Sequence, residues 1–174
     1  MEKQPLLLII DLQKGWRHET ATEEAMLNTV KLAQKFNGDI IHCRFINDES
    51  SLFYTSLRWD RFFTADDTAE IPEIEALRLP TYWRSTYSCV NEETLPLFRA
   101  ARKVYICGVF TDVSVTATAM GIFDVNVPVS VVSDCVASLH GEQSHIAELR
   151  SLESIIGAIN LPTAAGVLAD LSAE

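Results

Sequence analysis

The stretch KVYICGVFTDVSV, residues 103–115, decides the fold expected for this chain. Its apolar run Val104–Cys107 is too short for a buried helix and is bounded by Gly108. Such a run is typical of a central strand in a parallel sheet, where both faces of the strand are covered. The glycine then allows the tight turn that a strand needs before a following helix.

The second half of this stretch predicts the start of a helix. Thr111 and Asp112 are residue types that cap helices, and a helical pattern follows over Val113–Phe123. Ser114 is therefore expected at a helix N-terminus, beside the carboxyl end of a strand. In open α/β sheets small ligands bind at that edge, and a helix N-terminus favours an anionic or developing oxyanionic group.

Strand and helix patterns alternate along the rest of the chain. Strands are expected at Leu6–Ile10, Asp39–Phe45, Thr81–Arg84 and Pro128–Val132, with a last edge strand at Leu161–Thr163. Helices are expected from Thr20 or Thr22 to Phe36, from Asn91 or Glu92 to Ala101, over Gly141–Ile156 and over Ala164–Leu171. This alternation predicts a single domain over residues 1–174. Its fold class is α/β, three-layer α/β/α and Rossmann-like, with a mostly parallel sheet of about five to six strands.

The segment Asn47–Pro80 breaks the alternation. It is rich in carboxylates and contains Tyr54, Trp59, Phe62 and Phe63. Long ordered loops of this kind are usually lids or binding loops, so these aromatic residues are expected to line a pocket or a subunit contact. The alternative is a satellite apolar cluster that only holds the loop down.

Composition excludes several classes of partner. The chain has 174 residues, 48% of them hydrophobic, and a net charge of −10. Such acidity disfavours nucleic acids and anionic membranes as partners. No apolar run is long enough to span a membrane, and no signal peptide is evident. The scattered cysteines, without a C-x-x-C pair, favour a reduced, cytoplasmic location.

Neither a metal nor a cofactor is expected. The histidines stand apart in the sequence, at His18, His42, His140 and His145, and do not form a helix-face pair of ligands. The nucleotide fingerprints G-x-G-x-x-G and the P-loop are absent.

None of the cysteines has the helix N-terminal position that lowers the pKa of a thiol.

Four segments together resemble the isochorismatase-like cysteine hydrolase superfamily, which includes nicotinamidases and N-carbamoylsarcosine amidohydrolases. They are LLLIIDLQKGW (6–16), WRSTYSCV (83–90), GVFTDVSVTATAMGIFD (108–124) and VVSDCVAS (131–138). The resemblance covers nearly the whole chain, and the segments have the family's order and spacing. It implies hydrolysis of amides or related C–N bonds in small molecules.

The resemblance also implies a set of site residues. In the family an Asp takes the proton of a Cys that attacks the substrate carbonyl, and a Lys supports the Asp. By position these are Asp11, Ser114 and Arg84 here, with the backbone N–H groups of Ser114 and Phe110 as the oxyanion hole beside a cis Val109–Phe110 peptide. The flanking residues expected to contact substrate are Gln13, Trp16, Tyr87 and Thr111.

Two of the three catalytic positions depart from the family pattern. A serine hydroxyl at position 114 is far less acidic than a thiol and needs a well-tuned base. Arg84 cannot release a proton, and its planar fork fits a carboxylate. A direct Asp11–Arg84 pair is expected to lower the pKa of Asp11 and make it a poorer base.

Whether the chain is an enzyme therefore stays open at this stage. It is expected to be a hydrolase with an altered mechanism, a non-catalytic binding protein, or an isochorismatase-type vinyl-ether hydrolase using Asp11. For each residue a structural role is the alternative: a turn for Asp11, a brace for Arg84 and a helix cap for Ser114. The ligand is expected to be a small carbonyl compound, anionic if Arg84 clamps it. A homo-oligomer is expected, with Asn47–Pro80 closing the pocket.

Overall fold

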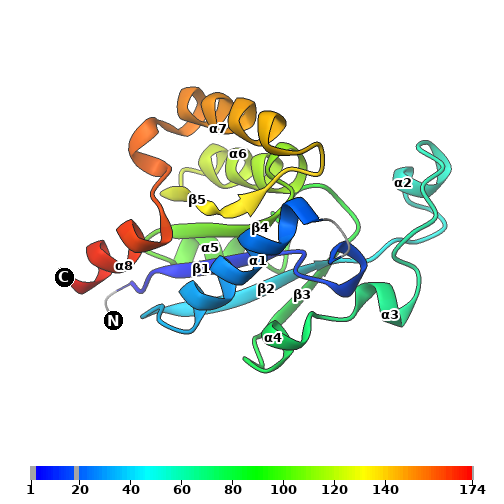
Figure 1. The fold of residues 1–174 in the computed structure, drawn as a ribbon, viewed down its shortest axis with the longest axis horizontal. Coiled ribbons are helices and arrows are strands. Elements are labelled where there is room, and N and C mark those ends of the chain that lie inside the picture. Colours follow the sequence, from blue (N-terminus) through cyan, green and yellow to red (C-terminus); the bar gives the residue numbers. More distant parts are fainter. Residues whose placement is uncertain (1–2, 18–19, 174) are drawn as a thin grey trace.

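The computed structural model describes residues 3–17 and 20–173 and shows an α/β fold built on one parallel sheet (Figure 1). The five strands lie in the order β3-β2-β1-β4-β5, and every neighbouring pair is parallel. Their bounds are β1 Leu6–Ile10, β2 Asp39–Phe45, β3 Thr81–Arg84, β4 Val104–Val109 and β5 Val129–Ala137. The predicted Rossmann-like class is confirmed.

Helices cover both faces of the sheet. They are α1 Thr20–Ala33, α2 Leu52–Thr55, α3 Ala65–Thr68, α4 Pro72–Glu75, α5 Leu95–Ala100, α6 Thr116–Asp124, α7 Glu142–Ile156 and α8 Ala164–Ser172. In β1, Leu7 and Ile9 face one apolar cluster with α1 and α8, whereas Leu6, Leu8 and Ile10 face another with α5, α6 and α7. All five residues of β1 are buried, which explains why its sequence is uniformly apolar.

The prediction of an edge strand at Leu161–Thr163 is wrong, because the structure has no strand in this segment. A 3₁₀ turn over Ala158–Asn160 precedes this segment, which makes one backbone hydrogen bond to β5, from the Ser133 N–H to the Pro162 carbonyl at 2.9 Å. Pro162 has no N–H to extend a ladder, and the Thr163 hydroxyl accepts from the Gly166 N–H as the N-cap of α8. The sheet therefore ends at β5.

Two predicted helix boundaries also move. Helix α5 begins at Leu95 because the Asn91 side chain accepts hydrogen bonds from the N–H groups of Glu93 and Thr94, which makes a turn of the preceding residues. Helix α1 ends at Ala33 rather than Phe36. Strand β5 runs five residues past the expected Val132, to Ala137, with a register shift against β4.

The segment Asn47–Pro80 is ordered around α2, α3 and α4. Phe62 is fully buried and stacks on Trp16 with ring centroids 4.2 Å apart, so part of the segment is a cluster that holds it to the core. The buried Asn47 amide donates to the carbonyl oxygens of Trp59 and Arg61 at 2.9 and 3.1 Å. Figure 1 shows α2 projecting beyond the carboxyl edge of the sheet.

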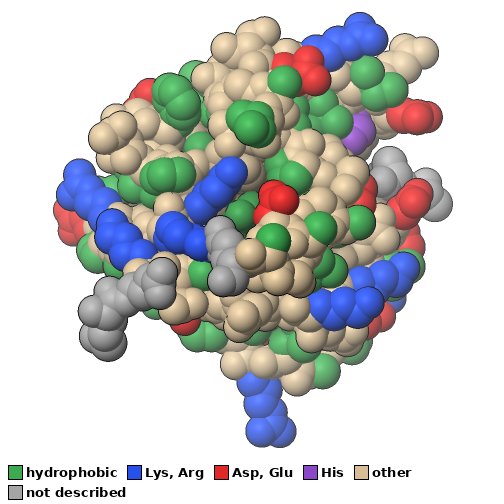
Figure 2. Space-filling model, turned by 90° about the vertical axis from the view of Figure 1, so that its left-hand side faces the viewer, with side chains coloured by type: hydrophobic (Ala, Val, Ile, Leu, Met, Phe, Trp, Pro, Cys, Tyr) green, Lys and Arg blue, Asp and Glu red, His purple; other side chains and the backbone are tan. Residues whose placement is uncertain are grey.

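The opposite edge has a different surface. Figure 2 shows the face at the amino ends of the strands, where Lys and Arg side chains are interspersed with apolar and acidic ones. The negative charge of the chain is therefore not gathered on this face.

Candidate active site

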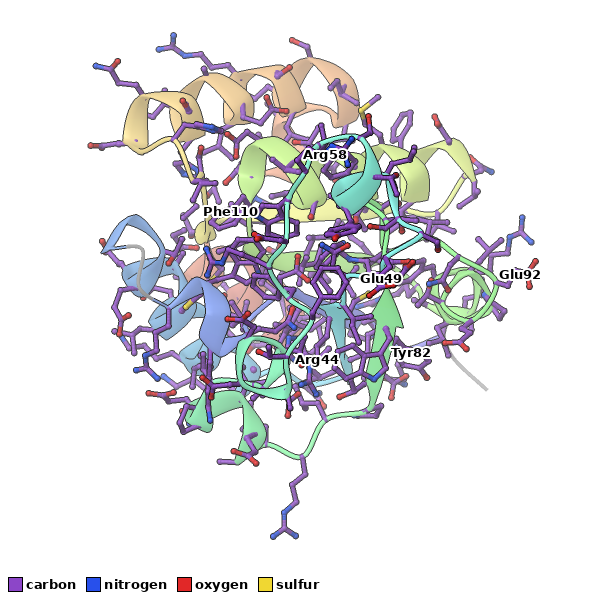
Figure 3. The ribbon with its side chains drawn as sticks, turned by 90° about the vertical axis from the view of Figure 1, so that its right-hand side faces the viewer. Arg44, Glu49, Arg58, Tyr82, Glu92 and Phe110 are labelled. Carbon is purple, nitrogen blue, oxygen red and sulfur yellow. The ribbon has the colours of Figure 1, made fainter. Side chains whose placement is uncertain are left out.

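The predicted catalytic residues meet at the carboxyl edge of the sheet. Asp11 follows β1, Ser114 follows the adjacent β4, and Arg84 ends β3. Because β2 lies between β1 and β3, only a long side chain at position 84 can reach Asp11 across it. Figure 3 looks onto this edge, with Phe110 near its middle.

Backbone contacts fix Asp11 in a tight turn. Its φ is 57°, in the left-handed region that an Asp tolerates better than most residues. The Asp11 N–H donates to the Cys43 carbonyl at 3.0 Å, and its own carbonyl accepts from the Gln13 N–H at 2.8 Å. The carboxylate is therefore directed over the end of the sheet by main-chain geometry.

Asp11 and Arg84 form a buried ion pair. The Arg84 guanidinium donates to Asp11 Oδ2 and to the Thr86 carbonyl. The Asp11 side chain is 5% exposed and the Arg84 side chain 2%. The other carboxylate oxygen, Oδ1, has no hydrogen-bond partner among the described residues. Ser114 lies close enough for its hydroxyl to lower the pKa of Asp11. The sequence left open whether these two side chains pair directly, and in the structure they do.

Arg84 lowers the pKa of Asp11, as expected, but burial of the carboxylate outweighs that effect. Burial raises the pKa of Asp11 from 3.8 to about 6, and the charge and hydrogen bond of Arg84 offset only part of that rise. A carboxylate with this pKa is mostly ionised at neutral pH and can still hold a proton during a reaction. It is therefore better suited to acid–base chemistry than the sequence suggested.

A cavity of about 290 Å³ opens between these side chains and the Asn47–Pro80 segment. Its lining is mainly aromatic and aliphatic, with three charged residues: Asp11, Trp16, Phe45, Phe53, Leu57, Trp59, Arg61, Arg84, Tyr87, Phe110, Val113, Ser114 and Leu139. Ligand pockets usually measure roughly 300–1,000 Å³, so this cavity suits a small molecule. A larger cavity of about 420 Å³ lies beside α1, β5 and α7 and contains none of the predicted catalytic residues.

The other predicted site residues divide into two groups. Trp16, Tyr87 and Phe110 line the cavity, whereas Gln13, Val109 and Thr111 do not. The Gln13 amide is buried and bonds to the Phe45 N–H, the Phe45 carbonyl and the Thr68 carbonyl. It braces the walls of the site instead of facing a ligand. The Thr111 hydroxyl is likewise occupied, by His145 Nδ1 at 2.9 Å.

The turn between β4 and the Ser114 helix has an unusual backbone. The Val109–Phe110 peptide is cis, at the position expected from the resemblance. Gly108 has a φ of 112°, and a Cβ there would lie 2.0 Å from the Ile10 carbonyl oxygen. Only glycine allows β4 to approach β1 this closely. Thr111–Val115 then forms one π-helical turn that carries Ser114 into α6.

His42 supports the Asp11 turn, a role that its spacing in the sequence does not indicate. The buried ring accepts the Leu12 N–H at Nε2, 3.2 Å away, so its proton lies on Nδ1, which bonds to Glu70 at 2.7 Å. Burial lowers the pKa of His42, although Glu70 raises it in part. A neutral His42 therefore anchors the residue that follows Asp11.

Cys89 has a lowered thiol pKa although it lacks the helix N-terminal position considered in the sequence analysis. It is buried in contact with Cys43 and Arg84. Burial opposes its ionisation, but the hydrogen bond with Cys43 and the charge of Arg84 together lower the pKa of the Cys89 thiol. This contact is made by tertiary structure rather than by a helix N-terminus, and Cys89 does not line the cavity.

Within the described residues, no group of three or more His, Cys, Asp or Glu side chains is placed to hold a metal ion. His18 lies outside those residues. Over the same parts of the chain, no helix has the length and apolar character needed to cross a membrane.

Comparison with solved structures gives the same fold over nearly the whole chain. An isochorismatase family protein from Burkholderia thailandensis is 19% identical, with a TM-score of 0.83 over 99% of this chain and 97% of that one. An isochorismatase-like hydrolase from Alkaliphilus metalliredigens is 18% identical, with a TM-score of 0.83 over 98% of this chain and 100% of that one. The nicotinamidase from Bacillus subtilis is 17% identical, with a TM-score of 0.74 over 91% and 98%.

The sequence comparisons address the family directly. No curated protein matches the chain. The model of the isochorismatase domain matches residues 5–161, which include β1, the Asp11 turn, Arg84 and the helix that carries Ser114. Because this match spans most of its length, the chain belongs to the isochorismatase family.

Proposed function

We propose that this protein hydrolyses the C–N bond of a small carbonyl compound, with Asp11 as general base and Ser114 as nucleophile. The observation that carries the proposal is the buried Asp11 carboxylate, with a pKa of about 6, beside the Ser114 hydroxyl in a small apolar cavity. Asp11 takes the proton of Ser114 as Oγ attacks the carbonyl carbon. The backbone N–H groups of Phe110 and Ser114 receive the oxyanion, as the family resemblance implies.

The reaction then needs the same proton again. Asp11 returns it to the leaving nitrogen as the C–N bond breaks, which leaves an ester on Ser114. Asp11 next takes a proton from water as its oxygen attacks the ester, and returns that proton to Ser114 Oγ as the ester C–O bond breaks and the acid leaves. Arg84 keeps the carboxylate in place throughout, because its charge stays paired with Oδ2 inside the protein.

Replacing Ser114 tests the nucleophile. Ser114→Ala is expected to lose turnover of small amides by about 10²-fold or more, because only water remains to attack. Ser114→Cys is expected to raise turnover above that of the wild type, because a thiol with a pKa of about 8.5 is activated far more easily than a hydroxyl. Ammonia release from a panel of small amides measures both.

Ser154→Cys, an exposed thiol on α7, is the matched control and is expected to leave turnover unchanged. If wild type and Ser114→Cys both bind small carbonyl compounds without turning them over, the protein is a binding protein instead. If isochorismate is hydrolysed and no amide is, the vinyl-ether reaction replaces the proposed one.

The proposal includes a homo-oligomer in which a second copy covers the mouth of the cavity. Leu57, Tyr87 and Leu139 line the cavity yet are 61%, 46% and 41% exposed, and Leu52 on the projecting α2 is 75% exposed. Exposed apolar groups clustered around a pocket favour a protein contact. Sedimentation velocity is expected to give a dimer or larger species that Leu57→Glu dissociates. A wild type that sediments as a monomer contradicts this part.

A further inference from the structure

Two cations, Arg61 and Arg84, line the cavity. Among the described residues, no carboxylate forms an ion pair with Arg61. The Arg84 guanidinium, by contrast, is committed to Asp11 and to the Thr86 carbonyl. The role of anion clamp, one of the alternatives that the sequence left open for Arg84, is therefore already taken up by Asp11 inside the protein. Any anionic group entering this cavity finds its counter-charge at Arg61.

The contacts of Arg61 leave part of its guanidinium available. One nitrogen, Nη2, donates to the Gly15 carbonyl at 2.6 Å. The guanidinium carbon lies 5.7 Å from the Trp16 ring centroid and 5.6 Å from that of Phe62, within cation–π range. A guanidinium has five N–H donors in a planar fork, so this anchored group retains donors for a carboxylate.

The backbone holds Arg61 at the cavity. The Asn47 amide donates to the Arg61 carbonyl, and the neighbouring Phe62 is fully buried. A charged donor that is already anchored loses little conformational entropy when it binds a ligand. This arrangement differs from that of a surface arginine, which samples many rotamers.

We propose that Arg61 binds a carboxylate of the ligand, so that this cavity takes small organic anions with a planar, unsaturated body. The carboxylate pairs with the free donors of Arg61, and the body packs among aromatic rings such as Phe45, Phe53 and Trp59. The carbonyl group of the ligand that is cleaved lies toward Asp11 and Ser114. Only this orientation of the ligand rests on the proposed function.

Binding measurements at pH 7.5 test the proposal without any turnover. Isothermal titration with benzoate and with its neutral isostere benzamide is carried out on wild type, Arg61→Gln, Arg61→Lys and Arg58→Gln. Wild type is expected to bind benzoate more tightly than benzamide, and Arg61→Gln to weaken benzoate about 10- to 100-fold with little effect on benzamide. Arg61→Lys keeps the positive charge but not the planar fork of donors. Its affinity for benzoate is expected to lie between those of wild type and Arg61→Gln.

Arg58, labelled in Figure 3, is the matched control. It is an exposed arginine three residues away that does not line the cavity. Arg58→Gln is expected to change benzoate binding less than about 2-fold, because an exposed charge outside the pocket contributes little. Equal binding of benzoate and benzamide by wild type overturns the proposal. Unchanged benzoate binding in Arg61→Gln also overturns it and leaves Arg61 as a brace for Gly15. If Arg61→Gln unfolds, the comparison of benzoate and benzamide binding is made with Arg61→Lys, and unchanged benzoate binding in that variant overturns the proposal.

Kinetics with 3- and 4-carbamoylbenzoate separate this inference from the proposed function. Arg61→Gln is expected to raise KM for these anionic substrates about 10- to 100-fold more than it raises KM for benzamide. Arg61-dependent benzoate binding without amide turnover in any variant supports the anion site and contradicts the hydrolase. Turnover of benzamide without any preference for anions supports the hydrolase and contradicts the anion site.

Discussion

Asp11→Asn is expected to lower kcat for amide hydrolysis by about 10²- to 10⁴-fold, the usual contribution of a general base. Asn keeps the size of the side chain but cannot take the Ser114 proton. As the proposed general base, Asp11 is active in its ionised form. The rate is therefore expected to fall as the pH drops below about 6, the pKa of Asp11, and to level off above it. Steady-state kinetics between pH 4.5 and pH 8.5 measure this, each condition checked for folded protein.

The direction of this pH dependence separates two mechanisms. If Asp11 acted as an acid on a vinyl ether, the protonated form would be active and the rate would fall as the pH rose above about 6. Retention of more than half of the wild-type rate by Asp11→Asn contradicts both roles.

Folding stability provides a second readout of the same group. Because burial raises the pKa of Asp11 from 3.8 to about 6, its contribution to stability is fully present below pH 3.8 and is lost as the pH rises through about 6. Asp11→Asn removes this component. His42 acts in the opposite direction, since its lowered pKa makes the folded state less stable as the pH falls below 6.5. The comparison of wild type with Asp11→Asn isolates the carboxylate from that background.

Arg84→Met is expected to lower the free energy of unfolding by about 3–5 kcal/mol, because it leaves the buried Asp11 carboxylate without its counter-charge. The loss is a consequence of burial: an exposed pair contributes at most about 1 kcal/mol. Methionine fills most of the volume of the arginine stem, so the effect reports mainly the charge. Urea unfolding at pH 7.5 measures it.

The same substitution is expected to change catalysis in a specific way. Without Arg84 the pKa of Asp11 rises above about 6, so the acid limb of the pH–rate profile moves to higher pH. Arg84→Lys is the control that retains a positive charge and is expected to restore part of the stability. An unchanged acid limb in Arg84→Met shows that Arg84 does not tune Asp11.

Much of the fold was predictable because its strands are strong local signals. The bounds of β1, β2 and β3 agree with those expected from the sequence, since each is a compact run ending at a turn or polar residue. The segment Leu161–Thr163 was not predictable in the same way. Its residues are compatible with a strand, but the edge of a sheet accepts a strand only where backbone donors are available to pair.

The site was predictable in its positions but not in its chemistry. Asp11 and Ser114 follow adjacent parallel strands, so the topology alone brings them to one edge. The pKa of Asp11 depends on how deeply the carboxylate is buried, and no sequence pattern reports that depth. Arg61 and His42 belong to the site through contacts with residues distant in sequence, at Gly15 and Leu12.

The sequence by itself determined the parallel α/β sheet, the order of its elements and the edge where Asp11, Arg84 and Ser114 lie. These follow from hydrophobic periodicity and turn chemistry, which act over a few residues. Only the tertiary structure decided that Arg84 is paired with Asp11, that Gln13 is a brace and that Arg61 faces the cavity. Those outcomes depend on burial and on the pairing of charges across strands and loops, and both are properties of packing in three dimensions.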